Sequence, residues 1–192
     1  MKIVECRDEL AAALVRTRSS SHPHTPLERE AFAVIEMAEA YQKDGVTFYN
    51  KGDLVNALAA FWYGSGWLHF GLSSGLLHGD VKNPFCPFAG PSDKLPLPLA
   101  EKLKEKTLRY NHLLDTARSS VECAGEPATI SNTFAVTILF ITAQYLSQGD
   151  SYRKAGAYED ALACFSYGHG WLDAGVTCGY FCIIAQQDLF TV

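Results

Sequence analysis

Two stretches of this chain repeat one another, and this duplication constrains the fold more than any other feature of the sequence. Residues 41–75 and 145–179 align at a constant offset of 104, and fourteen of their 35 paired positions are identical. A shorter match between residues 14–20 (LVRTRSS) and 114–120 (LDTARSS) extends the repeat upstream at an offset of 100. We therefore expect two copies of one unit, packed about an internal pseudo-twofold axis. Positions where the copies differ then mark features that the fold does not require.

Helical patterns fill both copies, and we expect an all-α fold: a six-helix bundle built from two pseudo-symmetric three-helix units. Thr25, Pro26 and Glu28 form a helix start, in which the threonine caps free N–H groups, the proline occupies the first turn and the glutamate reaches back. Gly52 and Gly156 each interrupt the helical pattern as a helix end does. No segment shows a strand pattern. The predicted helices span residues 3–18, 26–50 and 53–78 in the first copy and 98–120, 130–155 and 157–184 in the second.

The predicted domain organisation follows from the repeat. Residues 1–80 form the first three-helix unit and residues 98–192 the second. Residues 81–97 between them are rich in proline and glycine, which is typical of a connector.

The third predicted helix of each copy carries a stripe of small residues. A glycine inside a helix costs about 1 kcal/mol relative to alanine, so several in one helix require a compensating contact. Close approach of helix backbones is that contact. We expect the third helices to pack tightly, either on each other across the pseudo-twofold or on the second helix of their own unit. The predicted packing residues are Gly64, Trp67, Gly71 and Gly75 in the first copy and Gly168, Trp171, Gly175 and Gly179 in the second.

Composition excludes some classes of function. The net charge is −5 and no run of Lys or Arg is longer than a pair, which argues against a nucleic-acid-binding protein. The six cysteines form no CxxC pair and the N-terminus is charged, as expected for a protein of the reducing cytoplasm. Cys178 and Cys182 lie one helical turn apart, but two thiolates do not complete a zinc site. We predict no metal and no cofactor.

A long uncharged stretch raises the question of a membrane span. Residues 54–77 contain 24 residues without a formal charge, which is long enough to cross a bilayer. The stretch nevertheless contains several polar side chains, and its twin carries Asp173. We therefore expect the buried central helix of a bundle and no membrane. Lysines and glutamates alternate in residues 101–109, which predicts a solvated helix face there.

His169 and Asp173 are the strongest candidates for a site, because they lie four residues apart on one face of a predicted helix. An aspartate beside a histidine can orient it for acid–base chemistry or help to hold a polar ligand. It can also simply satisfy a buried histidine. The first copy has Ser65 and His69 at these positions, so the fold tolerates the loss of the pair. A binding pocket between the copies would be lined by Tyr145, Tyr167, His169 and Asp173, with His69 from the first copy.

Two resemblances bear on identity. The hairpin of the second and third helices is similar in spacing to a tetratricopeptide repeat, but the two copies lie 104 residues apart rather than in tandem. The motif at residues 52–57, followed by the motif at residues 167–175 (YGHGWLDAG), resembles the archaeal domain-of-unknown-function family 357. This resemblance implies an archaeal helical protein with two fused copies of the domain, and it implies no reaction.

No catalytic constellation stands out, so the first hypothesis for function is a non-catalytic protein-interaction or assembly module of the cytoplasm. Its partner would be another protein or a second copy of the chain. The alternative is a small-molecule-binding protein or enzyme with a pocket around His169 and Asp173. The sequence does not decide whether the chain is an enzyme, although it favours a protein that is not one.

Overall fold

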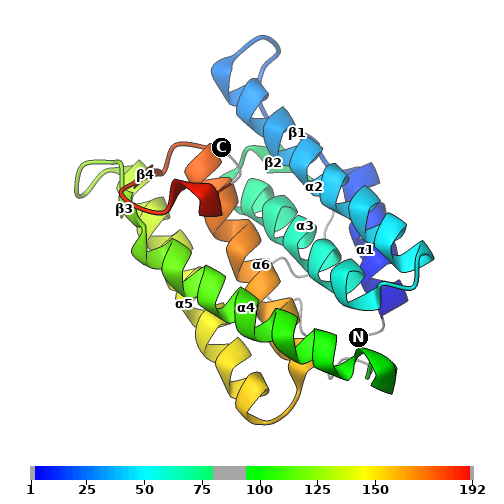
Figure 1. Cartoon of the computed structure of the whole chain (residues 1–192). Helices are drawn as coiled ribbons and strands as arrows, with labels where there is room; N and C mark the ends of the chain where they lie inside the picture. The colour runs from blue at the N-terminus through cyan, green and yellow to red at the C-terminus, as the bar shows by residue number, and fades with distance from the viewer. Residues whose placement is uncertain (1–2, 80–93, 191–192) are drawn as a thin grey trace.

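The computed structural model describes residues 3–79 and 94–190, and within them the chain folds into six long helices (Figure 1). This confirms the predicted all-α six-helix fold. Most of the predicted connector at residues 81–97 lies outside the described residues, although Leu97–Leu99 forms a short 3-10 turn, η1. A second such turn, η2, spans Gln187–Leu189. The helices are α1 (Ile3–Arg16), α2 (Pro26–Asn50), α3 (Leu54–Ser74), α4 (Ala100–Ser119), α5 (Ile130–Lys154) and α6 (Tyr158–Thr177).

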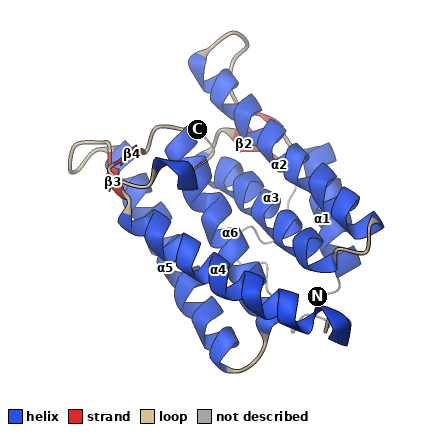
Figure 2. Cartoon of the chain, viewed as in Figure 1, coloured by secondary structure: helices blue, strands red, loops and turns tan. Residues whose placement is uncertain are grey.

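Two short antiparallel ladders correct the prediction that no strand is present (Figure 2). The strand β1 (Arg18–Ser19) pairs with β2 (Leu77–His78), and β3 (Val121–Cys123) pairs with β4 (Phe181–Ile183). Each ladder joins the segment after a unit's first helix to the segment after its third. The third helices were predicted to run to residues 78 and 184, but they end earlier. The reason is a left-handed glycine after each helix, with φ of 79° at Gly75 and 75° at Gly179, which turns the chain back.

Local sequence explains where the second and third helices of the first copy begin. The Thr25 side chain accepts a hydrogen bond from the Glu28 N–H at 3.2 Å, and the Glu28 carboxylate accepts one from the His24 N–H at 2.5 Å. Asp53 caps α3 by accepting from the Asn56 N–H at 3.3 Å. The predicted capping arrangement at Thr25 is confirmed.

The two units meet where α3 crosses α6, at the centre of the molecule in Figure 1. A Cβ atom on Gly66 would lie 2.5 Å from the carbonyl oxygen of Tyr167 and 3.1 Å from the Cα of Gly170. Gly170 approaches the backbone of Tyr63 in the same way. Because Gly66 and Gly170 are equivalent at the offset of 104, the pseudo-twofold axis passes between them.

The glycines of the predicted packing stripe do not lie at this crossing of α3 and α6. Gly64 and Gly71 face side chains or backbone of α2, and Gly168 and Gly175 face the equivalent positions of α5. Trp67 and Trp171 are fully buried. Gly75 and Gly179 lie just beyond the helices, and a Cβ on either would meet no atom within 4 Å. Helix packing across the twofold therefore depends on Gly66 and Gly170, and the stripe packs each third helix within its own unit.

The uncharged stretch of the first copy forms α3, which is buried over most of its length. Among the described residues, one helix is long and apolar enough to cross a membrane by length and composition. This helix is α5, and only 17% of its most apolar window is buried inside the molecule.

The glycine crossing generates a stability prediction. Gly66→Ala places a methyl group against backbone atoms that cannot rotate away, so α3 and α6 must separate. The better helix propensity of alanine recovers about 1 kcal/mol. We expect a net loss of about 2 kcal/mol or more in the free energy of unfolding, measured by chemical denaturation.

Ser65→Ala, one residue away on the same helix, is the control and should change stability little. The pair Gly66→Ala and Gly170→Ala should destabilise by less than the sum of the single variants, because both separate the same two helices. Strictly additive losses would contradict a shared crossing.

Candidate functional site

Two tyrosine contacts link the halves on either side of the glycine crossing. The hydroxyl of Tyr63 on α3 donates a hydrogen bond to the carboxylate of Asp173 on α6. The hydroxyl of Tyr167 on α6 lies 2.9 Å from the Nδ1 of His69 on α3. Tyr63 and Tyr167 are equivalent at the offset of 104, as are His69 and Asp173. The pseudo-twofold therefore produces the same contact twice, once with a carboxylate and once with an imidazole.

Each of these tyrosines also packs on a tyrosine of the second helix in its own unit. The ring centroids of Tyr41 and Tyr63 are 4.3 Å apart, and those of Tyr145 and Tyr167 are 4.5 Å apart. Asp173 is fully buried, and burial lowers the pKa of His69 to about 4, so the His69 imidazole is neutral at neutral pH. These four predicted site residues, Tyr145, Tyr167, His69 and Asp173, thus lie in the interior contact between the halves.

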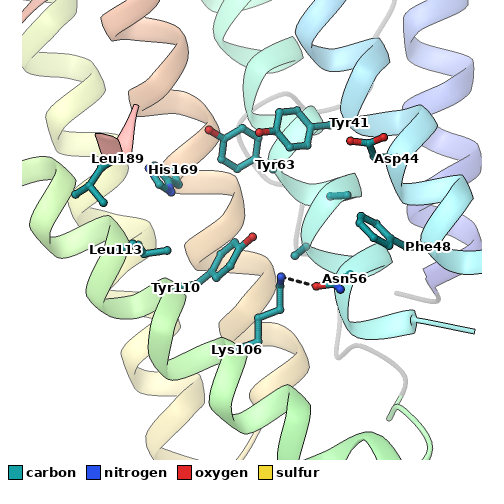
Figure 3. Close-up of a pocket in the computed structure, with 12 residues that line it drawn as sticks. Tyr41, Asp44, Phe48, Asn56, Tyr63, Lys106, Tyr110, Leu113, His169 and Leu189 are labelled. Carbon is teal, nitrogen blue, oxygen red and sulfur yellow. Dashed lines mark hydrogen bonds between the residues drawn. The ribbon is translucent and has the colours of Figure 1, made fainter. Parts of the chain in front are cut away.

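His169 faces elsewhere. It lines a pocket of about 410 Å³ that lies between α2 and α3 of the first unit and α4 and α6 of the second (Figure 3). None of the other four predicted site residues lines this pocket. The lining residues are Tyr41, Asp44, Phe48, Asn56, Ala59, Ala60, Tyr63, Lys106, Tyr110, Leu113, His169 and Leu189.

The imidazole of His169 is only partly satisfied. The side chain is 7% exposed, and its Nε2 has no hydrogen-bond partner among the described residues. Burial lowers the pKa of His169, and the charge of Asp173 and the backbone at Leu189 oppose this effect. The ring is therefore neutral at neutral pH, and its Nε2 is buried without a partner.

Lys106 on α4 brings an amine to the opposite end of the pocket (Figure 3). Its Nζ donates to the Oδ1 of Asn56 at 2.5 Å and lies 4.7 Å from the centre of the Tyr110 ring. The residue is 9% exposed. Burial, with a smaller contribution from the charge of Arg109, lowers the pKa of this amine from 10.5 to about 8. The sequence-based prediction of a solvated face is therefore wrong at this position.

One pattern in the sequence could have identified Lys106. Leu103 and Tyr110 lie three residues before and four residues after it, so all three share one helix face. Leu103 is buried, and Tyr110 lines the pocket beside Lys106. A lysine that lies between apolar residues on one helix face is unusual, and this pattern could have indicated that Lys106 is buried.

The structure gives less support to a metal site or to a reactive cysteine. Within the described part of the chain, no three His, Cys, Asp or Glu side chains gather in a way that could hold a metal ion. The buried thiols of Cys6 and Cys164 have raised pKa values because of burial, to about 12 in the case of Cys6. Such thiols are poor nucleophiles at neutral pH.

Comparison with known proteins identifies the repeated unit. The profile of the family described as "Protein of unknown function (DUF357)" matches the chain twice, at residues 8–77 and 109–181. The two segments hold 70 and 73 residues, about three quarters of the 192 in the chain. Each falls in one of the two structural halves. No curated protein and no solved structure matches the chain.

The buried amine predicts an unusual dependence of stability on pH. In the unfolded chain Lys106 keeps a pKa near 10.5, whereas in the folded protein its pKa is about 8. Between these values the unfolded state binds more protons, so this group makes folding more favourable as the pH rises. We expect Lys106→Met to be at least as stable as the wild type at pH 7, with its advantage shrinking as the pH approaches 10. Denaturation curves at several pH values measure this difference.

Lys104→Met on the exposed face of α4 is the matched control, because it removes the same charge without relieving burial. Its difference from the wild type should not vary with pH across this range. A Lys106→Met variant that is less stable at pH 7 by an amount independent of pH would refute the buried charge.

The interior contact at Asp173 gives a second prediction. Asp173→Asn keeps the shape of the side chain but replaces an acceptor oxygen with an N–H donor in a fully buried position. We expect the free energy of unfolding to fall by about 1–3 kcal/mol, as for other disrupted buried hydrogen bonds. Chemical denaturation checks this, with Asp115→Asn at an exposed site of α4 as the control. Unchanged stability would argue against a structural role.

Proposed function

The chain belongs to the DUF357 family of proteins of unknown function, as two fused copies of its domain, and we propose that it binds a small organic molecule in the pocket between them. This is the alternative raised from the sequence, with the site moved to the pocket side of His169. The observation that carries the proposal is His169, which lines the pocket and whose buried Nε2 has no partner among the described residues.

A buried polar atom without a hydrogen bond costs roughly 1–3 kcal/mol. The fold does not require this cost, because the first copy has Ser65 at the equivalent position, where its hydroxyl donates to the carbonyl oxygen of Phe61. A ligand that bonds to Nε2 would remove the cost. The unsatisfied nitrogen is thus explained if the pocket is occupied during function.

The difference between the two copies supports the same proposal. The two ladders keep the offset of 104 after the first helix of each unit, and Leu10 and Leu114 pack on the equivalent glycines Gly64 and Gly168, so the offset of 100 expected from the sequence is wrong there. At the offset of 104, Tyr110 and His169 of the pocket correspond to Cys6 and Ser65. A volume of about 410 Å³ falls within the range of small-molecule sites.

A second candidate is the interaction or assembly module, and the outer face of α5 favours it. Arg29, Glu36 and Lys43 are exposed on α2, and their equivalents at the offset of 104 are Thr133, Phe140 and Ser147. Phe140 is 62% exposed. One copy has thus replaced a charged surface with an uncharged one, which is a feature of protein-interaction surfaces.

The binding proposal is tested by native mass spectrometry of the protein isolated gently from its own cells. We expect a stoichiometric adduct on the 21.1 kDa chain. We also expect at least a tenfold loss of that adduct in His169→Phe, which keeps a ring but removes the polar nitrogen. His112→Phe changes an exposed histidine of α4 and should retain the adduct.

The absence of any adduct from the wild type, or equal occupancy in the two variants, would overturn the binding proposal. The same spectra also test the second candidate function. A homo-oligomer or a stoichiometric protein partner without a small adduct would favour an assembly role.

A further inference from the structure

We infer that the pocket takes a small organic anion, with its acidic group at Lys106, its planar body among the aromatic rings and an uncharged hydrogen-bonding group at His169. This inference rests on the proposed binding function and names the class of ligand. It concerns carboxylates and phosphates alike, because either group can pair with an ammonium ion.

The first support is the unpaired charge of Lys106. An ammonium group has three donors, and Asn56 accepts one of them at 2.5 Å. Among the described residues no ion pair joins this amine to a carboxylate. Lys102, one turn earlier on α4, is paired with Asp53 at 2.8 Å, and Asp53 also accepts from Asn56. The Asp53 carboxylate is thus engaged by the exposed Lys102, and the buried Lys106 keeps an open place for an anion.

The second support is the arrangement of the charges around the pocket. Asp44 is the carboxylate among the lining residues, and it is exposed on α2, beside Tyr41 and away from Lys106 in Figure 3. A cationic ligand would find its carboxylate at Asp44, at the exposed end of the pocket, where water screens the attraction. An anion meets an attractive charge at the buried end, where solvent screens it least.

The third support is the shape of the walls. The rings of Phe48, Tyr63 and Tyr110 project toward the pocket from three different helices, as the close-up in Figure 3 shows. Flat aromatic surfaces on several sides favour a ligand with a planar, unsaturated body.

The fourth support is the imidazole of His169 at the other end of the pocket. Its Nε2 has no partner among the described residues. The ring is neutral, and a neutral imidazole nitrogen accepts or donates a hydrogen bond according to its tautomer. A polar, uncharged group of the ligand would bond to it. The two ends of the pocket thus favour different groups, an acid at Lys106 and an uncharged hydrogen-bonding group at His169.

The test uses four small probes on the full-length protein at pH 7, with dissociation constants measured by ligand-observed NMR. Benzoate and phenyl phosphate carry the acid, benzamide is neutral and benzylamine is cationic. We expect both anions to bind at least tenfold more tightly than benzamide, and benzylamine to bind most weakly. This comparison uses the wild type alone and so does not depend on whether a variant folds.

Variants then locate the charge that is responsible. Lys106→Met should reduce the affinity for benzoate to that for benzamide, and Lys106→Arg should keep the preference for anions. Lys104→Met, at an exposed lysine of the same helix, should match the wild type.

Three results would overturn the inference: a preference for benzamide or benzylamine, equal effects of Lys106→Met and Lys104→Met, or no binding of any probe. In the first two cases probes still bind, so the proposed binding function survives and only the ligand class is wrong. Failure of every probe, together with the absence of an adduct on the isolated protein, would overturn both.

Discussion

The close approach of α3 and α6 at Gly66 and Gly170 is the contact on which the rest of the molecule depends. Because no side chain separates the two backbones there, residues three positions to either side can reach across to the partner helix. Tyr63 therefore contacts Asp173, and its twin Tyr167 contacts His69. The same crossing brings α4 of the second unit opposite α2 and α3 of the first, which encloses the pocket. The glycines thus determine the symmetry, the interior polar contacts and the position of the candidate site together.

A duplicated fold allows one copy to change what the other keeps. Both tyrosine contacts satisfy a hydroxyl in the interior, yet one uses an aspartate and the other a histidine, so this position tolerates different chemistry provided that a partner for the hydroxyl remains. The pocket shows a larger divergence. Tyr110 and His169 occupy positions at which the first copy has Cys6 and Ser65, and these replacements place a phenol and an imidazole among the residues that line the pocket. Symmetry therefore explains the scaffold, and departures from symmetry identify the residues that need a functional explanation.

The sequence predicts the helices and the duplication well, because helical periodicity, caps and repeated glycines are local or directly countable features. It does not reveal the ladders, since strands of two or three residues are too short to show an alternating pattern. The sequence identifies His169, but it assigns Asp173, Tyr145, Tyr167 and His69 to the same site. That assignment fails because residues four apart on a buried helix can face different surroundings. The burial of Lys106 is missed for a related reason. Its charged neighbours in the sequence predict a solvent-exposed helix face, whereas the other unit packs against this face of α4. For Asp173 and Lys106, what the sequence lacks is the position of the other unit.

The energetics of the pocket argue that it is not a by-product of packing. A buried amine whose pKa falls to about 8 and a buried imidazole nitrogen without a partner both oppose folding at neutral pH. An apolar side chain in place of Lys106, and a serine such as Ser65 of the first copy in place of His169, would relieve both costs, so the fold alone gives no reason for either group. A ligand that pairs with the amine and bonds to the imidazole reverses the sign of both contributions, because binding only to the folded state stabilises it by mass action. The two polar groups are therefore unfavourable in the empty protein and favourable in the complex, which is the relation expected of a binding site whose residues are selected for the ligand rather than for stability.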